Sequence, residues 1–229
     1  MGKFLEVEKR HQTDFKTRAP YFTNAARADG VYKGKPRPFC LPCECAEENL
    51  FPGIRQAITA YFAAQEIKWH DGQGWRPSNH LCSSQVCCAN FLFPFADKPL
   101  ALVELLRPVF PTIRQVIPME NESLFVSFEW IGLKNYLGER VSHQGKRTRG
   151  ANFTSADAAV RFERTDGLRQ IVLMEWKYTE SYGGASLRVA KSGTDRTEIY
   201  KWLFNNSDCP LNKELLPGFD ALFFEPFYQ

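Results

Sequence analysis

Two carboxylates and an ammonium group, those of Asp157, Glu175 and Lys177, are the side chains of this sequence best suited to chemistry. Directly opposed residues of an antiparallel strand pair have Cβ atoms about 4.5–5.5 Å apart. Strand side chains alternate between faces, so Lys177 shares a face with Glu175. Paired carboxylates suit a divalent metal, and an ammonium group beside them suits the phosphate or water that a metal polarises.

A β-hairpin is the element that would bring the two acids together. Residues 157–163 and 170–177 read as strands, and Thr165-Asp166-Gly167 between them is a turn signal. Its glycine can adopt the left-handed conformation that a three-residue hairpin loop needs. The numbers of paired residues in a hairpin have a constant sum, which this loop sets at 332. The loop therefore predicts that Asp157 lies opposite Glu175.

These residues resemble the PD-(D/E)XK nuclease superfamily, whose motif is matched by Asp157 and Glu175-x-Lys177. The triplet also occurs as Asp14-Phe15-Lys16 and Glu66-Ile67-Lys68, but only the third copy ends an apolar strand across a turn from an acid. Wider segments look like a bacterial group of restriction-endonuclease-like proteins within that superfamily, so the resemblance covers most of the chain. These segments are Trp69-His70-Asp71, Asn79-His80-Leu81, Ser83-Ser84-Gln85, Tyr136–Arg140, Arg149–Asp157 and Glu175–Glu180.

The resemblance implies an α/β fold with a restriction-endonuclease-like core, a central mixed sheet flanked by helices. It implies a DNA endonuclease that depends on Mg²⁺ or Mn²⁺, with Asp157 and Glu175 as metal ligands. Lys177 would orient or activate the attacking water, or neutralise charge on the phosphate. It also implies a further helix, bearing Gln and Arg, after Gln229, where this sequence ends.

A third acid is implied as well. Superfamily members often place a Glu on the helix before the central strands, where it reaches the metal. Glu139 matches this residue by order and by the group's pattern, which makes it a further catalytic residue and metal ligand. Glu129 is the rival, because it faces away from the apolar side of its strand. A helix cap or a salt bridge is the alternative explanation for either acid.

A basic segment precedes the hairpin. From Arg140 to Gly150 the chain carries Lys146, Arg147 and Arg149 and no acid. The functional interpretation is contact with nucleic-acid phosphates beside the metal site. The alternative is a solvated loop. The formal net charge of the whole chain is only +3, so net charge alone does not argue for nucleic acid.

The chain of 229 residues is long enough for one large domain or two small ones. We expect residues 1–120 to form a mostly helical N-terminal part packed on a nuclease-like core of residues 121–229. The N-terminus lacks the apolar core of a signal peptide, and no run of about 18 apolar residues predicts a membrane helix. Seven cysteines without a secretion signal favour reduced thiols in a cytoplasm.

Periodicity and breaker residues predict the elements. We expect an extended lead-in over residues 1–45, a helix over 46–67, a helix capped by Ser83 or Ser84 and ended by Pro94, a helix capped by Asp97 and ended by Pro108, a strand over 124–130, the hairpin, a helix over 197–204, and a short strand or helix start over 221–227.

Two alternatives concern metal and function. Cys40-x-x-Cys43-x-Cys45 with Cys82, Cys87, Cys88, His70 or His80 offers zinc ligands, but only one cleanly paired set is present. We therefore expect small buried thiols and hydrogen-bonded core histidines.

The alternative to an enzyme is a catalytically silent nucleic-acid-binding module with the same fold. The recognition sequence, DNA against RNA, and monomer against homodimer stay open.

Overall fold

The computed structural model describes residues 3–72, 75–120, 123–139, 147–150, 153–180, 186–190, 193–209, 211–216 and 218–223. The chain forms two compact units, residues 1–131 with 148–180, and residues 132–147 with 181–229. The position of one unit relative to the other is not determined.

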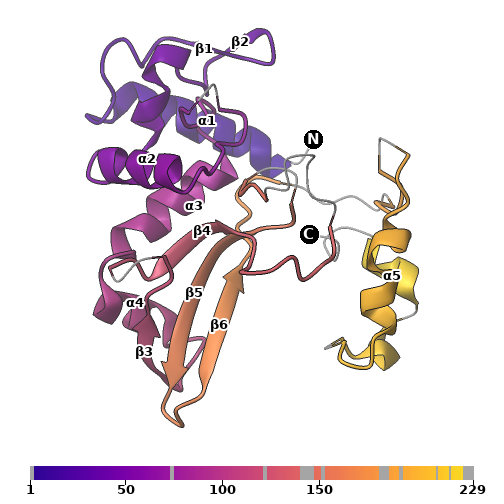
Figure 1. The fold of residues 1–229 in the computed structure, drawn as a ribbon. Coiled ribbons are helices and arrows are strands. Elements are labelled where there is room, and N and C mark those ends of the chain that lie inside the picture. Colours follow the sequence, from indigo (N-terminus) through magenta and orange to yellow (C-terminus); the bar gives the residue numbers. More distant parts are fainter. Residues whose placement is uncertain are drawn as a thin grey trace. The chain divides into compact units, whose positions relative to one another are not determined.

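A four-stranded sheet is the centre of the first unit (Figure 1). It consists of β3 (Ile113–Ile117), β4 (Val126–Trp130), β5 (Ala156–Arg164) and β6 (Arg169–Met174). Strands β3 and β4 pair with successive parts of one edge of β5, and β6 pairs with its other edge. All of these pairs are antiparallel, so the expected mixed sheet is wrong for the strands that the structure describes. The fold is mixed α/β.

Three helices cover one face of this sheet, α2 (Arg55–Ala64), α3 (Ser84–Leu92) and α4 (Pro99–Leu106) (Figure 1). Side chains of a strand alternate between faces. The members that face the helices are apolar and join one buried cluster with helical residues, among them Phe128, Ala158, Val160, Phe162, Ile58, Phe62, Ala89 and Leu102.

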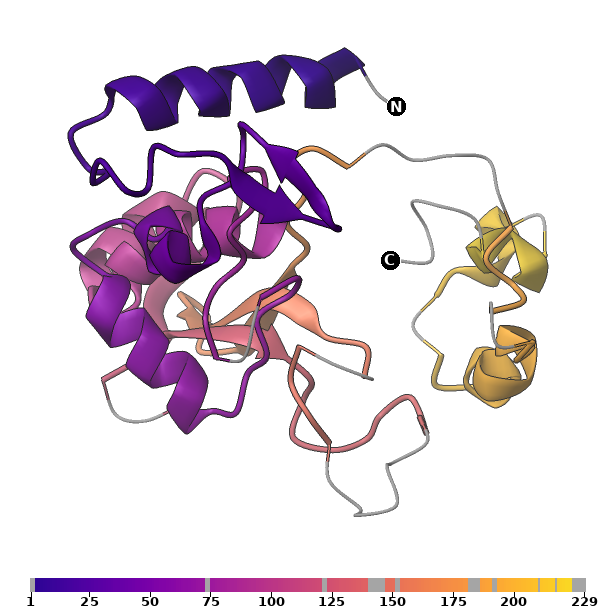
Figure 2. The same cartoon turned by 90° about the horizontal axis from the view of Figure 1, so that it is seen from above.

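Helix α1 (Lys3–Arg18) lies where the sequence predicted an extended lead-in, so that prediction is wrong. The helix is polar, and it is anchored by a buried lysine. Nζ of Lys16 donates to the carbonyl oxygens of Ala28, at 2.9 Å, and Cys40, at 3.0 Å. Figure 2 shows α1 along one side of the unit, next to the small hairpin of β1 (Gly30–Tyr32) and β2 (Lys35–Arg37).

The predicted helix starts fare differently. Ser83 caps α3, since its side chain accepts a hydrogen bond from the N–H of Val86, which confirms that prediction. Asp97 does not cap α4, whose N-cap is Lys98 with proline in the first turn. The helix predicted over residues 46–67 is divided into a 3₁₀ segment, Cys43–Asn49, and α2. Pro52 and Gly53 lie between them, and both residue types disfavour a continuous helix.

The second unit contains α5 (Arg196–Asn205), as the sequence predicted, with Asp195 as its N-cap. Two short 3₁₀ segments follow, Lys213–Leu215 and Phe219–Phe223. The second of them overlaps the strand or helix start predicted over residues 221–227. The remainder of that segment lies outside the described residues.

The surroundings of the cysteines and histidines bear on the alternative of a zinc site. All seven cysteines are free, and Cys40, Cys45, Cys82 and Cys88 are buried. Nδ1 of His80 accepts a hydrogen bond from the N–H of Cys82 at 3.0 Å, and burial lowers the pKa of His80 to about 4. His80 is therefore a neutral, hydrogen-bonded and partly buried histidine, whereas the side chain of His70 is 54% exposed and is not a core histidine.

Within the described ranges, no single helix is long and apolar enough to cross a bilayer. Segments Ser84–Phe95 and Pro99–Leu106 meet that length and composition only when taken together, and they are bent by 120° at the break between them.

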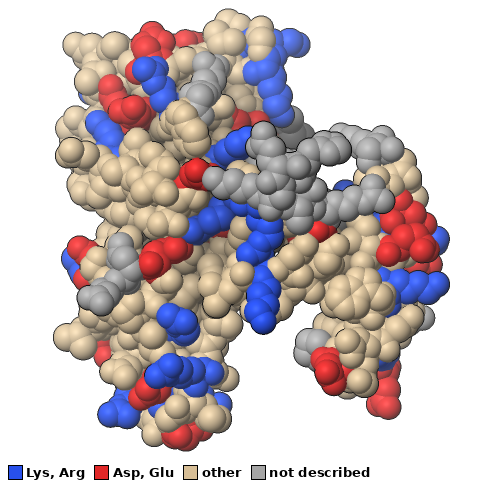
Figure 3. All heavy atoms as spheres, viewed as in Figure 1, with Lys and Arg blue, Asp and Glu red and all other residues tan. Residues whose placement is uncertain are grey.

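The tip of the β5–β6 hairpin carries charges of both signs (Figure 3), including an ion pair of 2.6 Å between Arg164 and Asp166.

Candidate active site

The register of the β5–β6 hairpin is the one that its turn predicted. Ala158 pairs with Met174 and Glu163 with Arg169, and both pairs sum to 332. Gly167 has φ +81°, and its N–H donates to the carbonyl of Arg164, which closes the three-residue loop. Continuing this register by one step beyond the last pair places Asp157 opposite Glu175.

Asp157 is held by the backbone of the opposite segment. The N–H of Trp176 donates to Oδ2 of Asp157 at 2.5 Å. The pKa of Asp157 is raised to about 6, chiefly by burial and in smaller part by the negative charges of Glu175 and Glu129. The Trp176 hydrogen bond and the positive charge of Lys177 oppose that rise. A carboxylate with a pKa pushed upward by burial and by like charges is typical of a site that gains a cation.

Glu175 and Lys177 lie just after β6, which ends at Met174 rather than at Lys177 as predicted. Nζ of Lys177 is 2.5 Å from Oε1 of Glu175, so the two side chains share a face as expected. Their side chains are 42% exposed for Glu175 and 29% exposed for Lys177. The pair is accessible to a substrate from solvent.

Glu129 on β4 lies at the level of Asp157, because Phe128 pairs with Ala158 and Trp130 with Ala156. Its side chain is only 2% exposed. Its backbone φ is +48°, a left-handed conformation that is uncommon outside glycine, asparagine and aspartate. Strained backbone of this kind is concentrated at functional sites. Glu129 on β4 and Asp157 on β5 therefore lie at one level of the sheet, and Glu175 follows directly after the end of β6.

Gln85 and Ser155 hold the Glu129 carboxylate. Nε2 of Gln85 donates to Oε1 of Glu129 at 2.7 Å, and Oγ of Ser155 donates to Oε2 at 2.9 Å. Nε2 of His70 lies 4.0 Å from Oε1 of Glu129. These contacts join residues far apart in the chain, so the sequence predicted no role for Gln85 or Ser155, and for His70 only those of a zinc ligand or a core histidine.

Glu139 belongs to the second unit and follows a turn at residues 136–137 rather than lying on a helix. The side chain of Asn135 bonds both its N–H, at 3.0 Å, and its carbonyl, at 2.6 Å. The hydroxyl of Tyr200 donates to Oε1 of Glu139 at 3.2 Å. The structure therefore groups Glu129, and not Glu139, with the hairpin acids in one unit.

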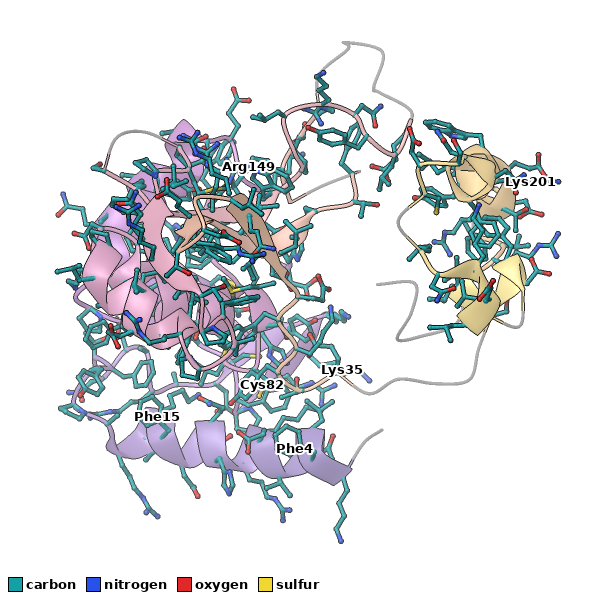
Figure 4. The ribbon with its side chains drawn as sticks, turned by 90° about the horizontal axis from the view of Figure 1, so that it is seen from below. Phe4, Phe15, Lys35, Cys82, Arg149 and Lys201 are labelled. Carbon is teal, nitrogen blue, oxygen red and sulfur yellow. The ribbon has the colours of Figure 1, made fainter. Side chains whose placement is uncertain are left out.

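The predicted phosphate-binding residues have different surroundings. Arg149 lies beside the sheet (Figure 4), and its side chain is 12% exposed. Its guanidinium donates to the Ser127 hydroxyl at 2.8 Å, to Gln65 at 3.1 Å, and to backbone carbonyls of β4, and it pairs with Glu120 at 2.9 Å. These contacts give Arg149 a structural role.

Arg147, in the second unit, donates to the carbonyls of Lys134, at 2.6 Å, and Gly132, at 3.0 Å. Lys146 lies outside the described residues.

The donor chemistry fits a hard divalent cation. Asp157 and Glu175 supply carboxylate oxygens, which Mg²⁺ prefers, and Mg²⁺ usually keeps several waters beside one or two carboxylates. Within the described part of the chain, no group of three or more His, Cys, Asp or Glu side chains is arranged to hold a metal. The residues thus offer a two-carboxylate site that bound water would complete.

Comparisons with known proteins give one family and no individual relative. No curated protein matches the chain, and no solved structure matches it. Residues 9–229 match the family described as Restriction Endonuclease associating with ARP. Because that match spans nearly all of the sequence, including both units and every candidate site residue, this chain belongs to the family of restriction endonucleases associating with ARP.

Proposed function

We propose that this protein is a metal-dependent DNA endonuclease of the PD-(D/E)XK type, which hydrolyses phosphodiester bonds. The observation that carries the proposal is the register of the β5–β6 hairpin. That register brings Asp157 opposite Glu175, with Lys177 paired to Glu175 at 2.5 Å. Family membership supports a restriction-endonuclease-like activity independently of this geometry.

Each residue has a distinct role in this proposal. Asp157 and Glu175 hold Mg²⁺ or Mn²⁺. When bound, the metal polarises the phosphate and lowers the pKa of its water. Lys177 hydrogen-bonds the attacking water or a phosphate oxygen, since its ammonium group stands beside Glu175. Glu129 replaces Glu139 as the additional acid, because Glu129 lies at the level of Asp157 in the same sheet.

Contact with DNA is assigned to the basic segment before the hairpin. Lys146 and Arg147 are proposed to bind phosphates, whereas the side chain of Arg149 is only 12% exposed and its charge is paired with that of Glu120. The family description adds an association with ARP, which makes a partner of that kind a further candidate for this chain.

A second candidate is a catalytically silent DNA-binding module. It is favoured by one observation, that the described residues include no cluster of three metal-binding side chains. A silent module would bind DNA without cutting it.

Incubation of the purified protein with supercoiled plasmid separates the two candidates. The nuclease is expected to nick or linearise DNA with Mg²⁺ or Mn²⁺ and to stop when EDTA is added. Asp157→Asn and Glu175→Gln should abolish cutting and weaken metal binding, because each removes a ligand charge. A parent protein that retards DNA in a gel but never cuts it, with either metal, supports the silent module instead.

A further inference from the structure

Gln85 is a buried amide with three polar contacts in the first turn of α3. Its Oε1 accepts from the backbone N–H of His70 at 2.8 Å. Its Nε2 donates to the carbonyl of Lys68 at 3.1 Å and to Oε1 of Glu129 at 2.7 Å. The amide oxygen accepts from a backbone N–H, and the amide nitrogen donates to two oxygens. Exchanging the oxygen and the nitrogen would break these contacts, so the three partners fix the orientation of the amide.

The contact with Glu129 is the one that bears on chemistry. A buried carboxylate needs hydrogen-bond donors, since leaving it without them costs several kcal/mol. Gln85 and Ser155 donate to the two oxygens of Glu129, one each. Gln85 supplies a neutral donor, which satisfies the carboxylate without neutralising its charge. The negative charge of Glu129 thus remains available to a cation bound beside the neighbouring acids.

The backbone of Glu129 makes this support necessary. A residue with φ +48° is not held in place by the regular strand ladder, and the β4–β5 pairing passes from Phe128 to Trp130. The direction of the Glu129 side chain is therefore set by the groups that bind its carboxylate. Gln85 can do this rigidly because its own amide is held at the backbone of residues 68–70.

We propose that Gln85 is a positioning residue of the nuclease site, which holds the Glu129 carboxylate beside Asp157 and Glu175. This inference rests on the proposed function, since it makes Glu129 the additional acid next to the two-carboxylate metal site. It adds a residue on a helix to a site otherwise built from strands, and it makes residues 68–70 part of the support of that site.

The test compares Gln85→Leu with a matched control. Asn49 is also a buried amide, and its Nδ2 donates to the carbonyls of Ser78, at 2.8 Å, and His80, at 3.0 Å, with no acid involved. Asn49→Leu therefore removes a comparable buried amide elsewhere in the same unit. Mn²⁺ affinity is measured by isothermal titration calorimetry at a temperature where circular dichroism shows each variant folded.

Gln85→Leu is expected to weaken Mn²⁺ binding by about tenfold or more, the usual effect of removing a group that supports a ligand. Asn49→Leu should lose stability and keep the affinity of the parent. If Gln85→Leu does not fold, Gln85→Asn gives the same comparison, because its shorter side chain keeps the amide but withdraws it from Glu129.

A double-mutant cycle shows whether Gln85 acts through Glu129. In a Glu129→Gln background, replacing Gln85 should change Mn²⁺ affinity little, because the charge it positions is gone. Additive effects of the two substitutions, or equal effects of Gln85→Leu and Asn49→Leu, would overturn the inference while the parent still binds Mn²⁺ and cuts DNA. If the parent protein neither binds Mn²⁺ nor cuts DNA, the proposed function is wrong, and this inference is wrong with it.

Discussion

The backbone N–H of Trp176 donates a 2.5 Å hydrogen bond to the carboxylate of Asp157, across the two segments of the hairpin. The middle residue of the Glu-x-Lys triplet thus orients the acid on the neighbouring strand through its backbone. Its indole ring packs on Phe91 of α3, with ring centroids 5.1 Å apart. The triplet is therefore attached both to the strand beside it and to the helical layer.

Lys177→Ala should keep the fold and lose cleavage. An exposed ion pair contributes at most about 1 kcal/mol to stability, so the urea midpoint should change little. Loss of a group that acts on the water or phosphate should slow cleavage by about 10²-fold or more. Lys35→Ala, a lysine on β2 labelled in Figure 4, is the control and should cut at the parental rate. Equal rates for both variants would remove Lys177 from the mechanism.

Asp157→Asn should stabilise the protein at neutral pH. The pKa of Asp157 is about 6 in the folded protein against 3.8 as its ordinary value, so the folded state binds more protons between about pH 4 and pH 6. Stability of the parent therefore falls as pH rises through that window, and the deficit persists above pH 6.

The Asn variant has no proton to lose, so its advantage should be present at pH 7.5 and shrink toward pH 4. Urea unfolding across this range measures it. An Asn variant less stable than the parent at pH 7.5 would contradict the prediction.

Arg149→Ala should destabilise the first unit by about 3 kcal/mol or more, because it leaves buried acceptors and Glu120 without their donor. Arg114→Ala is the comparison, since its side chain is 63% exposed and pairs with Glu163 at 3.1 Å. That exposed pair should contribute less than about 1 kcal/mol. Similar urea midpoints for the two variants would show that the Arg149 network is not structural.

Gly150→Ala should be more harmful than Gly167→Ala. Both glycines have positive φ, +69° and +81°. A Cβ on Gly150 would lie 2.7 Å from the carbonyl oxygen of Lys68, whereas one on Gly167 would meet nothing within 4 Å. The Gly167 variant should lose about 1–2 kcal/mol from its backbone conformation alone. Thermal unfolding of both variants separates the steric cost from the conformational one, and equal losses would contradict the close approach.

Replacing Lys146 and Arg147 by alanine should weaken DNA binding and reduce its salt dependence. Each lost phosphate contact lowers the slope of log K against log salt by about 0.9. Fluorescence anisotropy with a labelled duplex, from low to high salt with Ca²⁺ in place of Mg²⁺, measures that slope. An unchanged slope would show that residues other than Lys146 and Arg147 contact the phosphates.

The hairpin could be predicted from sequence because its register is a local property. A three-residue loop with Gly167 at positive φ fixes which residues pair, and a one-residue slip would turn the apolar face outward. The Ser83 cap of α3 is local in the same sense. These signals predicted the β5–β6 register, from Ala158–Met174 to Glu163–Arg169, before any tertiary contact was considered.

The other features of the fold and of the candidate site depend on contacts between residues that are distant in the sequence. Helix α1 was missed because its anchor is a buried lysine, Lys16, and not an apolar stripe. Arg149 stood in a basic run that was interpreted as binding phosphates, with a solvated loop as the alternative, yet its partners come from α2 and β4. The bond from Gln85 to Glu129 spans 44 positions, and no spacing pattern predicts such a pair.

The conformation of Glu129 has a consequence for how this family can change. A residue at φ +48° is strained by its own Cβ, so glycine there would relieve the backbone and also remove a buried charge. Selection for heat resistance alone should therefore replace this residue readily, while selection for DNA cleavage should retain it. On the proposed function, a library of variants at residue 129 should therefore give different residues when it is sorted by survival of heating and when it is sorted by plasmid cutting.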